Sequence, residues 1–151
     1  MNAIELLKAD HKVVADLFEK VKASKESEHP AIFAEIKAEL DVHAHIEETI
    51  FYPKLKAEGN KELVDIVLEG IEEHGQIKKF LKELDAISNE SEKFEPKLKV
   101  LIEDTEHHVK EEEGEMFPLV EAQFDDAFIE DLGTQMEKEK SVFQKSQSAA
   151  A

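Results

Sequence analysis

The 151-residue chain contains no cysteine, no tryptophan and no arginine, and only five glycines, four prolines and one tyrosine. Without cysteine it forms no disulfide and offers no thiolate, so histidine and carboxylate are its strongest metal-binding groups. Its N-terminus, MNAIELLKADH, is charged and amphipathic, unlike a signal peptide. No apolar run is long enough to span a bilayer. These features predict a cytoplasmic protein.

Positive charge is also scarce, because 19 basic residues face 36 acidic ones and leave a formal net charge of −17. Every basic residue is a lysine. Such a negative field repels phosphate backbones and anionic headgroups. We therefore expect no nucleic-acid partner and no membrane partner, and we interpret the acidic residues as a solvated surface.

Few glycines and prolines interrupt the pattern of apolar residues, which recur at steps of three and four. This periodicity predicts long helices over residues 3–25, 30–57, 61–87 and 97–121, with turns at 24–30, 58–60 and 88–96. Gly59 is the expected C-cap at the second turn. Long helices joined by short turns favour an all-α fold, an antiparallel up-down-up-down four-helix bundle.

A shorter amphipathic C-terminal helix is expected over residues 125–143, packed across the bundle. Its apolar face could instead form a dimer contact, so a monomer and a homodimer both remain open. We place one domain over residues 1–146 and a flexible tail over residues 147–151.

One motif occurs twice, as HAHIEETIFYP at residues 43–53 and as HVKEEEGEMFP at residues 108–118. Each copy has a histidine, a glutamate four residues later, and a proline six residues after the glutamate. Residues four apart lie on one face of a helix. Each copy therefore aims an imidazole and a carboxylate in one direction, and each proline is expected to kink its helix rather than end it.

On each of the four long predicted helices the apolar residues form a stripe along one face. Histidine, or histidine with glutamate, interrupts each stripe at one place only. The interruptions are His11, His43 with Glu47, His74, and His108 with Glu112. The first two histidines each lie 16 residues from Ser27, in the first turn, and the last two each lie 17 residues from Ser91, in the last turn. In antiparallel helices equal distance from a turn means equal height, so all six side chains should meet in one layer. An ionised glutamate in a core is costly without a cation, and this set predicts a dinuclear metal site with open positions for a small ligand.

The remaining polar residues have structural interpretations. His45 and His107 are expected at the surface or behind a metal ligand, and His29 is expected in a solvated turn. Glu48, Glu111, Glu113 and Glu115 are interpreted as a solvated acidic face, with a hydrogen bond to a ligand histidine as the alternative. Tyr52 is interpreted as core packing, with a hydroxyl that approaches the site as the alternative. Gly70 and Gly75 flank His74 and would allow close helix contact or a path for a small ligand.

The segments DHKVV (residues 10–14), HAHIEETIFYP, EHGQIKKFL (residues 73–81) and HVKEEEGEMFP resemble the hemerythrin-like (HHE cation-binding) family. The resemblance covers roughly residues 3–121. It implies a four-helix bundle holding two iron ions in a non-haem, oxo- or hydroxo-bridged centre; zinc and manganese also suit these ligands. In that family such centres bind O₂, sense oxygen or redox state, or react with nitric oxide or peroxide.

The chain departs from the oxygen-carrying members at two places. They have a second histidine four residues after the third-helix histidine, where this chain has Lys78, and their last motif pairs histidine with aspartate five residues on. The set of four histidines and two glutamates is similar to that of bacterial hemerythrin-like proteins. We expect a di-iron protein that binds or senses O₂ or NO. The alternatives are an enzyme or stress protein that turns over peroxide or NO or donates iron for iron–sulfur repair, and a metal-free bundle. Lys78 is expected to face solvent or to donate a hydrogen bond.

Overall fold

The computed structural model describes residues 1–150, and these residues are helical nearly throughout, with no strand. In chain order the helices are α1 (Ala3–Ala23), η1 (Glu26–Glu28), α2 (His29–Ile46), η2 (Glu47–Phe51), α3 (Tyr52–Glu58), α4 (Lys61–Ala86), α5 (Phe94–Glu111), η3 (Glu112–Met116), α6 (Phe117–Gln123) and α7 (Asp126–Ala150). The all-α prediction is therefore confirmed. None of the described helices is long and apolar enough to cross a membrane.

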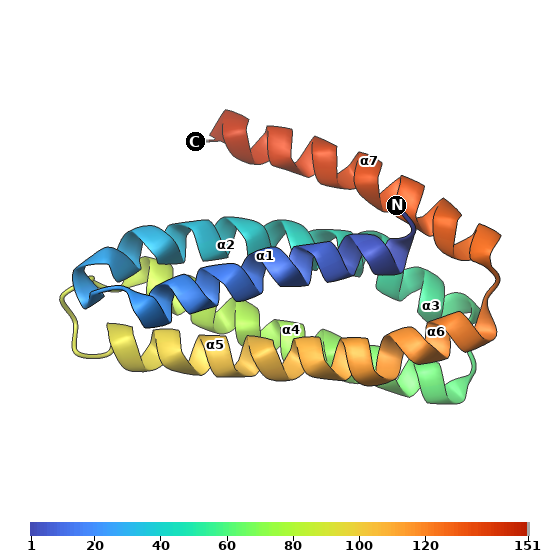
Figure 1. The fold of residues 1–151 in the computed structure, drawn as a ribbon, viewed down its shortest axis with the longest axis horizontal. Helices are drawn as coiled ribbons and strands as arrows, with labels where there is room; N and C mark the ends of the chain where they lie inside the picture. Colours follow the sequence, from blue (N-terminus) through green and yellow to red (C-terminus); the bar gives the residue numbers. More distant parts are fainter. Residues whose placement is uncertain (151) are drawn as a thin grey trace.

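Figure 1 shows how the long helices are arranged. α1 packs against α2, and α4 packs against α5. α2 continues into α3, and α5 continues into α6, so four long helical segments lie lengthwise beside one another in Figure 1. α7 crosses over α1 and α2, and its C-terminal half diverges from the bundle in this view.

The helix starts and stops follow from local side-chain chemistry. The side chains of Asn2 and Asn60 accept hydrogen bonds from the backbone N–H of Glu5 (2.8 Å) and Leu63 (3.0 Å), which caps α1 and α4. Gly59 is the C-cap of α3 as expected, with an extended backbone. A Cβ there would lie 2.6 Å from the carbonyl oxygen of Leu55, so only glycine fits this close approach.

Both prolines of the repeated motif lie just after a π-helical turn, which the apolar periodicity does not predict. η2 and η3 each span five residues and begin at Glu47 and Glu112. Pro53 and Pro118 then occupy the first turn of α3 and α6, where a missing N–H is tolerated. The wider turn relieves the clash between a proline ring and the carbonyl four residues earlier, so the helix continues instead of ending.

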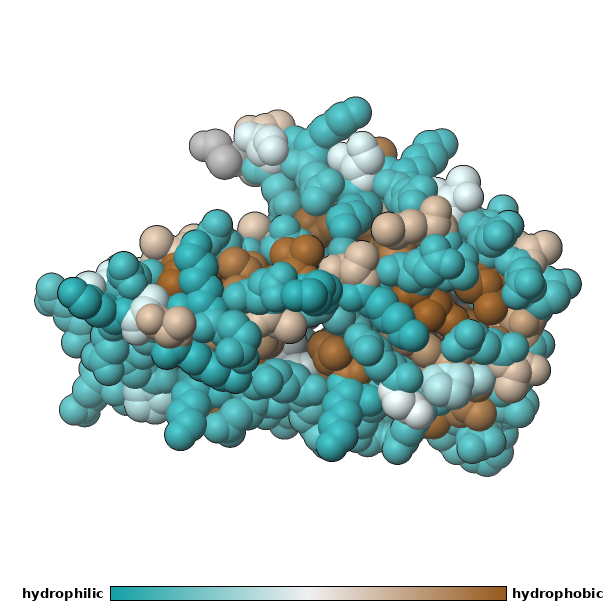
Figure 2. Space-filling model, in the orientation of Figure 1, coloured by the Kyte–Doolittle hydropathy of each residue, from teal (hydrophilic) through white to brown (hydrophobic). Residues whose placement is uncertain are grey.

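The apolar core has two parts, and a polar layer lies between them. One part surrounds Leu55 and Phe117, near the turn between α3 and α4. The other surrounds Phe33 and Phe94, whose rings meet edge to face near the opposite turns. Hydrophilic residues cover most of the face shown in Figure 2, with apolar residues visible in separate patches. Burial of both apolar parts therefore holds a polar layer at a fixed height in the bundle.

The C-terminal end of the chain differs from the sequence-based expectation. α7 has 25 residues and reaches Ala150, so it is not short, and residues 147–150 of the expected flexible tail are helical. The reason is that residues 144–150 lack glycine and proline and contain alanine and glutamine, which favour helices. Gln147 also donates a hydrogen bond to the carbonyl oxygen of Ala38 at 3.4 Å.

His29 was expected in a solvated turn, but it is buried in the first turn of α2. Its Nε2 bonds the carbonyl oxygen of Val21 at 2.9 Å, and its Nδ1 lies 2.7 Å from a carboxylate oxygen of Glu95. Sequence distance gave no sign of this contact, because Glu95 lies on a different helix, α5. His29 therefore joins α1, α2 and α5 at one end of the bundle.

Candidate metal centre

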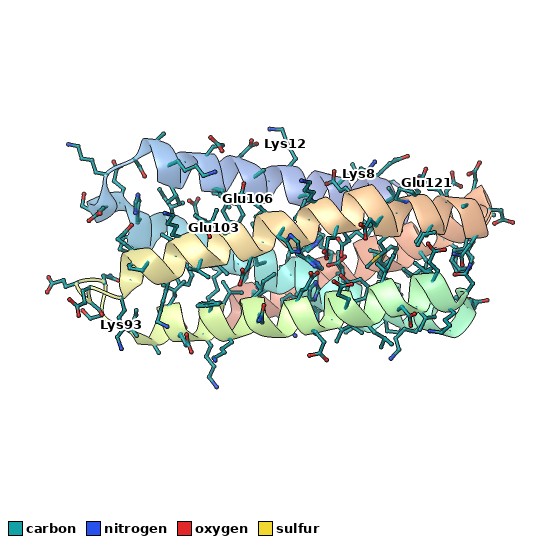
Figure 3. The ribbon with its side chains drawn as sticks, turned by 90° about the horizontal axis from the view of Figure 1, so that it is seen from below. Lys8, Lys12, Lys93, Glu103, Glu106 and Glu121 are labelled. Atoms are coloured by element: carbon teal, nitrogen blue, oxygen red, sulfur yellow. The ribbon has the colours of Figure 1, made fainter. Side chains whose placement is uncertain are left out.

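Six side chains from all four long helical segments meet in one buried layer, which we call the His/Glu layer. Its members are His11, His43, Glu47, His74, His108 and Glu112. The two glutamates have no exposed surface, and the four histidines are at most 5% exposed. In Figure 3 the nitrogen and oxygen atoms gather inside the bundle, whereas labelled charges such as Lys12 and Glu106 lie along its outside. The predicted convergence of all six residues is what the structure shows.

The histidines form two pairs, and each glutamate reaches both pairs. His11 and His43 have ring centroids 4.9 Å apart, and His74 and His108 have centroids 4.7 Å apart. Oε1 of Glu47 lies 3.1 Å from Nε2 of both His43 and His74. Glu112 lies 3.1 Å from Nε2 of His11 through Oε1 and 3.1 Å from Nε2 of His108 through Oε2. Each carboxylate thus bridges the two histidine pairs.

Every histidine of the layer has a carboxylate behind it, at Nδ1. The pairs are His11–Glu113 (2.6 Å), His43–Asp10 (3.1 Å), His74–Glu48 (2.8 Å) and His108–Glu73 (2.7 Å). A carboxylate at Nδ1 places the proton of a neutral imidazole on that nitrogen. The Nε2 lone pairs therefore point inward, towards one another and towards the two glutamates.

Such an inward arrangement of electron pairs is stabilised by positive charge, either protons on the histidines or a metal ion. Nε2 of His43 and both carboxylate oxygens of Glu47 are buried without a hydrogen-bond partner among residues 1–150. Nε2 of His74 lies 3.1 Å from Nε2 of His108. Buried acceptors without a donor are costly. Ligand atoms of Glu47, His74, His108 and Glu112 lie within 4.8 Å of one another, as do those of His11, His43 and Glu112, so the layer fits a metal site.

The pKa shifts in the layer have the same origin. Burial lowers the pKa of His108, but hydrogen bonds to Glu112 and Glu73 outweigh it and raise that pKa to about 10. The pKa of His43 is likewise raised well above its usual value, by Glu47 and Asp10 against the effect of burial. Burial raises the pKa of the Glu112 carboxyl, yet hydrogen bonds from His108 and His11 hold it well below its ordinary value. Positive charge is favoured at these positions, and metal ions would compete there with protons.

The profile of one protein family, described as the hemerythrin HHE cation binding domain, matches residues 2–120. The chain belongs to this family. The match includes all six members of the His/Glu layer and ends before α7 begins. The resemblance inferred from the motifs is thereby confirmed.

Relatives of the chain extend this finding. It is 31% identical to the uncharacterized protein Rv2633c of Mycobacterium tuberculosis, over 90% of this chain and 83% of that protein. It is 27% identical to a protein named DNA nickase from Nostoc, over 96% of this chain but only 41% of that longer protein. The crystal structure of a hemerythrin HHE cation binding domain-containing protein, the Rv2633c homolog from Mycobacterium kansasii, superposes with a TM-score of 0.82. It is 29% identical and matches 97% of this chain and 89% of that chain, so the fold is hemerythrin-like.

Tyr52 contributes a hydroxyl to the layer of this HHE domain, which was the less favoured interpretation of the sequence. The hydroxyl donates a hydrogen bond to Glu112 and lies 3.3 Å from Nε2 of both His74 and His108. Burial and the charge of Glu112 raise the pKa of Tyr52 well above its usual value. Tyr52 therefore supplies a neutral proton donor beside the bridging carboxylate.

A small cavity borders the His/Glu layer on the side of η1. Part of its wall is a second layer, Val14, Leu40, Ile77 and Thr105, each three residues from a histidine of the first layer. The hydroxyl of Thr105 is already donated to the carbonyl oxygen of Leu101. The cavity leaves about 30 Å³ for the centre of a water-sized molecule, and one buried water needs roughly 10–15 Å³. A diatomic molecule therefore has room beside the histidines, against mostly apolar walls.

Sequence reasoning missed Asp10 and Glu73, which hold His43 and His108. The sequence did contain a signal. Each carboxylate behind a histidine is the direct neighbour of a layer member, in Asp10–His11, Glu47–Glu48, Glu73–His74 and Glu112–Glu113. Each of them supports a histidine on a different helix from its own, so the pairing became visible only in the tertiary structure.

The other polar residues named from the sequence either lie at the surface or hydrogen-bond a neighbouring side chain. His107 is 64% exposed, as expected, and pairs with Glu111 at 3.0 Å. His45 faces away from the layer, also as expected, but it bonds Glu139 of α7 at 2.8 Å. Lys78 donates a hydrogen bond to Glu48, in agreement with the prediction for that position.

Gly70 is buried, and a Cβ there would lie 3.3 Å from the Tyr52 hydroxyl, whereas one on Gly75 would meet nothing within 4 Å. Gly70 thus makes room for Tyr52.

Proposed function

We propose that this chain is a non-haem di-iron protein that binds or senses O₂ or NO. His11 and His43 would hold one metal ion, His74 and His108 the other, and Glu47 and Glu112 would bridge them. We interpret the four helical segments as the antiparallel up-down-up-down bundle that presents one histidine each. When bound, such a pair of iron ions supplies reversible redox chemistry and open positions for a small ligand.

The bridging geometry of the two glutamates carries this proposal. A single metal ion would need its ligands around one point, but the imidazoles here form two pairs with a carboxylate between them on each side. Two glutamates also neutralise part of the charge of two divalent ions. Imidazole and carboxylate ligands suit iron, and they also suit zinc and manganese, so metal identity is part of the test.

The apolar cavity supports a small neutral ligand. Its walls beside the histidines are mostly aliphatic, and the hydroxyl of Thr105 is already used by the backbone. Asp41 and Lys78 also line the cavity, but they are paired with Lys37 and Glu48. Such walls offer little to a charged or strongly hydrated ligand, whereas O₂ and NO lose almost no hydration there. The net charge of −17 also opposes anionic ligands at long range.

The Tyr52 hydroxyl favours a second candidate function, turnover of peroxide or NO. It donates a hydrogen bond to Glu112 and lies 3.3 Å from Nε2 of both His74 and His108, so it could supply a proton within the layer during turnover. Steady-state turnover that is lost in Tyr52→Phe would favour this enzyme, whereas stoichiometric reaction alone would favour the binding protein.

The deciding experiment is metal content together with the optical spectrum of the aerobically purified protein, followed by titration with O₂ and NO. We expect about two irons per chain, as in other di-iron carboxylate bundles, with near-ultraviolet charge-transfer bands that change on reduction and gas binding. No spectral change of the reduced, iron-loaded protein with either gas would refute O₂ or NO binding. Absence of iron after reconstitution would refute the di-iron centre.

A matched pair of variants tests the bridge. Glu112→Gln removes one bridging charge, and we expect it to weaken binding of at least one metal ion by about 10-fold or more. Glu115→Gln makes the same chemical change at an exposed position three residues away and should bind metal like the wild type. Equal metal binding by both variants would contradict a role for Glu112.

A further inference from the structure

A helix outside the matched HHE region reaches into the surroundings of the His/Glu layer. The family profile ends at residue 120, whereas Lys140 lies in α7. Nζ of Lys140 lies 2.5 Å from Oδ1 of Asp10, and Oδ2 of Asp10 lies 3.1 Å from Nδ1 of His43. One carboxylate thus connects an α7 lysine to a proposed metal ligand.

Burial makes this connection electrostatically important. Asp10 is only 4% exposed, so its negative charge is poorly solvated. When a metal ion holds His43 as a neutral ligand, Lys140 remains the only full positive charge paired with Asp10 among residues 1–150. Lys140 therefore partly neutralises the negative charge that Asp10 presents to Nδ1 of His43.

The four histidines differ in this respect. Among the described residues, Glu113 and Glu73, behind His11 and His108, form no ion pair with a lysine. Glu48, behind His74, pairs with Lys78, but that lysine is 53% exposed, against 26% for Lys140. Exposed ion pairs are weakened by solvent, so the lysine from α7 acts on its carboxylate more strongly.

Neighbouring contacts hold this part of α7 in place. Glu139 bonds Nε2 of His45 at 2.8 Å, and the ring of Phe143 stacks on His45 with centroids 4.2 Å apart. His45 is two residues from His43 on α2, so the α7 segment from Glu139 to Phe143 is fixed over the outer side of the same helix. The position of Lys140 thus follows from packing on both of its sides.

We propose that Lys140 is a positioning residue that, through Asp10, tunes the metal ion held by His11 and His43. A lysine beside Asp10 reduces the pull of the carboxylate on the Nδ1 proton of His43, so the imidazole donates less electron density to its metal ion. The lysine also adds positive charge near that ion. Both effects favour the reduced state, so α7 raises the reduction potential of one half of the centre. This inference rests on the proposed di-iron centre.

The test compares reduction potentials in the iron-loaded full-length chain by mediated redox titration. Lys140→Met should shift the ratio of oxidised to reduced iron in one of the two steps about tenfold towards the oxidised form, which corresponds to about 59 mV for one electron. Lys140→Arg keeps the charge and should restore most of the shift. Lys138→Met removes the same charge from an exposed position on α7 and should titrate like the wild type.

A spectroscopic readout separates this role from a structural one. In zinc-loaded protein, the Nδ1 proton of His43 should move to lower field in Lys140→Met, because Asp10 then accepts a stronger hydrogen bond. The inference is overturned if folded Lys140→Met binds both irons with wild-type potentials and its zinc-loaded form shows an unmoved His43 proton signal. That outcome would leave the proposed function intact. If Lys140→Met does not fold, Lys140→Gln replaces it under the same criteria. If the wild type takes up no metal after reconstitution, the proposed function and this inference both fail.

Discussion

Single residues around the His/Glu layer act in pairs, an imidazole inside and a carboxylate behind it. The carboxylate fixes the tautomer and the ring orientation, so each Nε2 lone pair points to the place where a cation is needed. Lys78 also supports one of these carboxylates, because it donates a hydrogen bond to Glu48. Oxygen-carrying members of the family have a fifth histidine at the position of Lys78. In the proposed di-iron centre, a lysine at this position would leave one metal position without a protein ligand.

Tyr52→Phe removes the hydroxyl that donates to Glu112 and leaves the packing of the ring unchanged. We expect binding of iron or zinc to weaken about 10-fold, as is typical when a supporting hydrogen bond to a ligand is lost. Competition with a chelator measures this change. Thr105→Val removes a buried hydroxyl that bonds only the backbone and is the control, and equal affinities for the two variants would contradict the prediction.

His29, which lies outside the His/Glu layer, makes the stability of the fold depend on pH. Both of its ring nitrogens face acceptors, so the protonated ring can donate a hydrogen bond from each nitrogen. Burial lowers the pKa of His29, but hydrogen bonding and charge from Glu95 raise it above its ordinary value. A raised pKa stabilises the fold fully below the unfolded value of about 6.5, and this stabilisation is lost as pH rises through the folded value.

We therefore expect Glu95→Gln to lower the free energy of unfolding at about pH 6 by about 1–2 kcal/mol, with allowance for the exposure of Glu95. The difference from wild type should shrink as pH rises above the folded pKa of His29. Urea unfolding across the pH range measures it. Glu92→Gln removes a nearby exposed charge and should show no such difference, and a gap that widens with pH would contradict the assignment.

At the scale of helices, two local devices position the layer. The π-helical turns η2 and η3 begin at the bridging glutamates and let the chain continue through Pro53 and Pro118. α7 then lies across α1 and α2, with Gly133 directly against the N-terminal backbone. A Cβ at Gly133 would lie 2.3 Å from the carbonyl oxygen of Met1. The start of the chain and α7 are thus held together by a contact that leaves no room for a side chain.

Gly133→Ala should therefore destabilise the protein even though alanine favours helices. Its Cβ would meet backbone atoms of Met1, Asn2 and Ala3, which cannot rotate away. We expect a loss of about 1–3 kcal/mol, typical of an overpacked site. Gly75→Ala, with nothing within 4 Å of the new Cβ, should instead stabilise its helix by about 0.5–1 kcal/mol. Chemical denaturation compares the two variants, and a stabilising Gly133→Ala would show that α7 lies elsewhere.

At the scale of the whole molecule, the two apolar halves of the core enclose a layer whose acceptors lack donors. The folded state without a metal ion is held by the apolar parts and by protons on the histidines. Metal ions bind the folded layer but find no such arrangement in the unfolded chain, so binding and stability are linked.

Metal removal should therefore lower the unfolding temperature. With free metal at about 100 times the dissociation constant, the free energy of unfolding rises by about 2.7 kcal/mol, or roughly 5–10 °C for a domain of this size. Thermal unfolding with iron, with zinc and with a chelator measures the effect, and protons should be released on loading because the pKa values of His43, His74 and His108 are raised. Identical unfolding temperatures with and without metal would argue for a metal-free bundle.

The sequence alone determined which residues form the His/Glu layer. Height along a helix is proportional to sequence distance, at about 1.5 Å per residue, so equal spacing from each turn placed His11, His43, His74 and His108 at one level. The apolar stripes determined which way those residues face. These properties belong to one helix at a time and are therefore readable from a linear pattern.

Only the tertiary structure decided which side chains meet across helices. Asp10 reaches His43, the Tyr52 hydroxyl reaches Glu112, and Lys140 reaches Asp10 across 130 residues. The burial of His29 and the docking of α7 are of the same kind. Each depends on how helices rotate about their own axes and pack on non-adjacent neighbours, and periodicity within one helix carries no information about the partner's side chains.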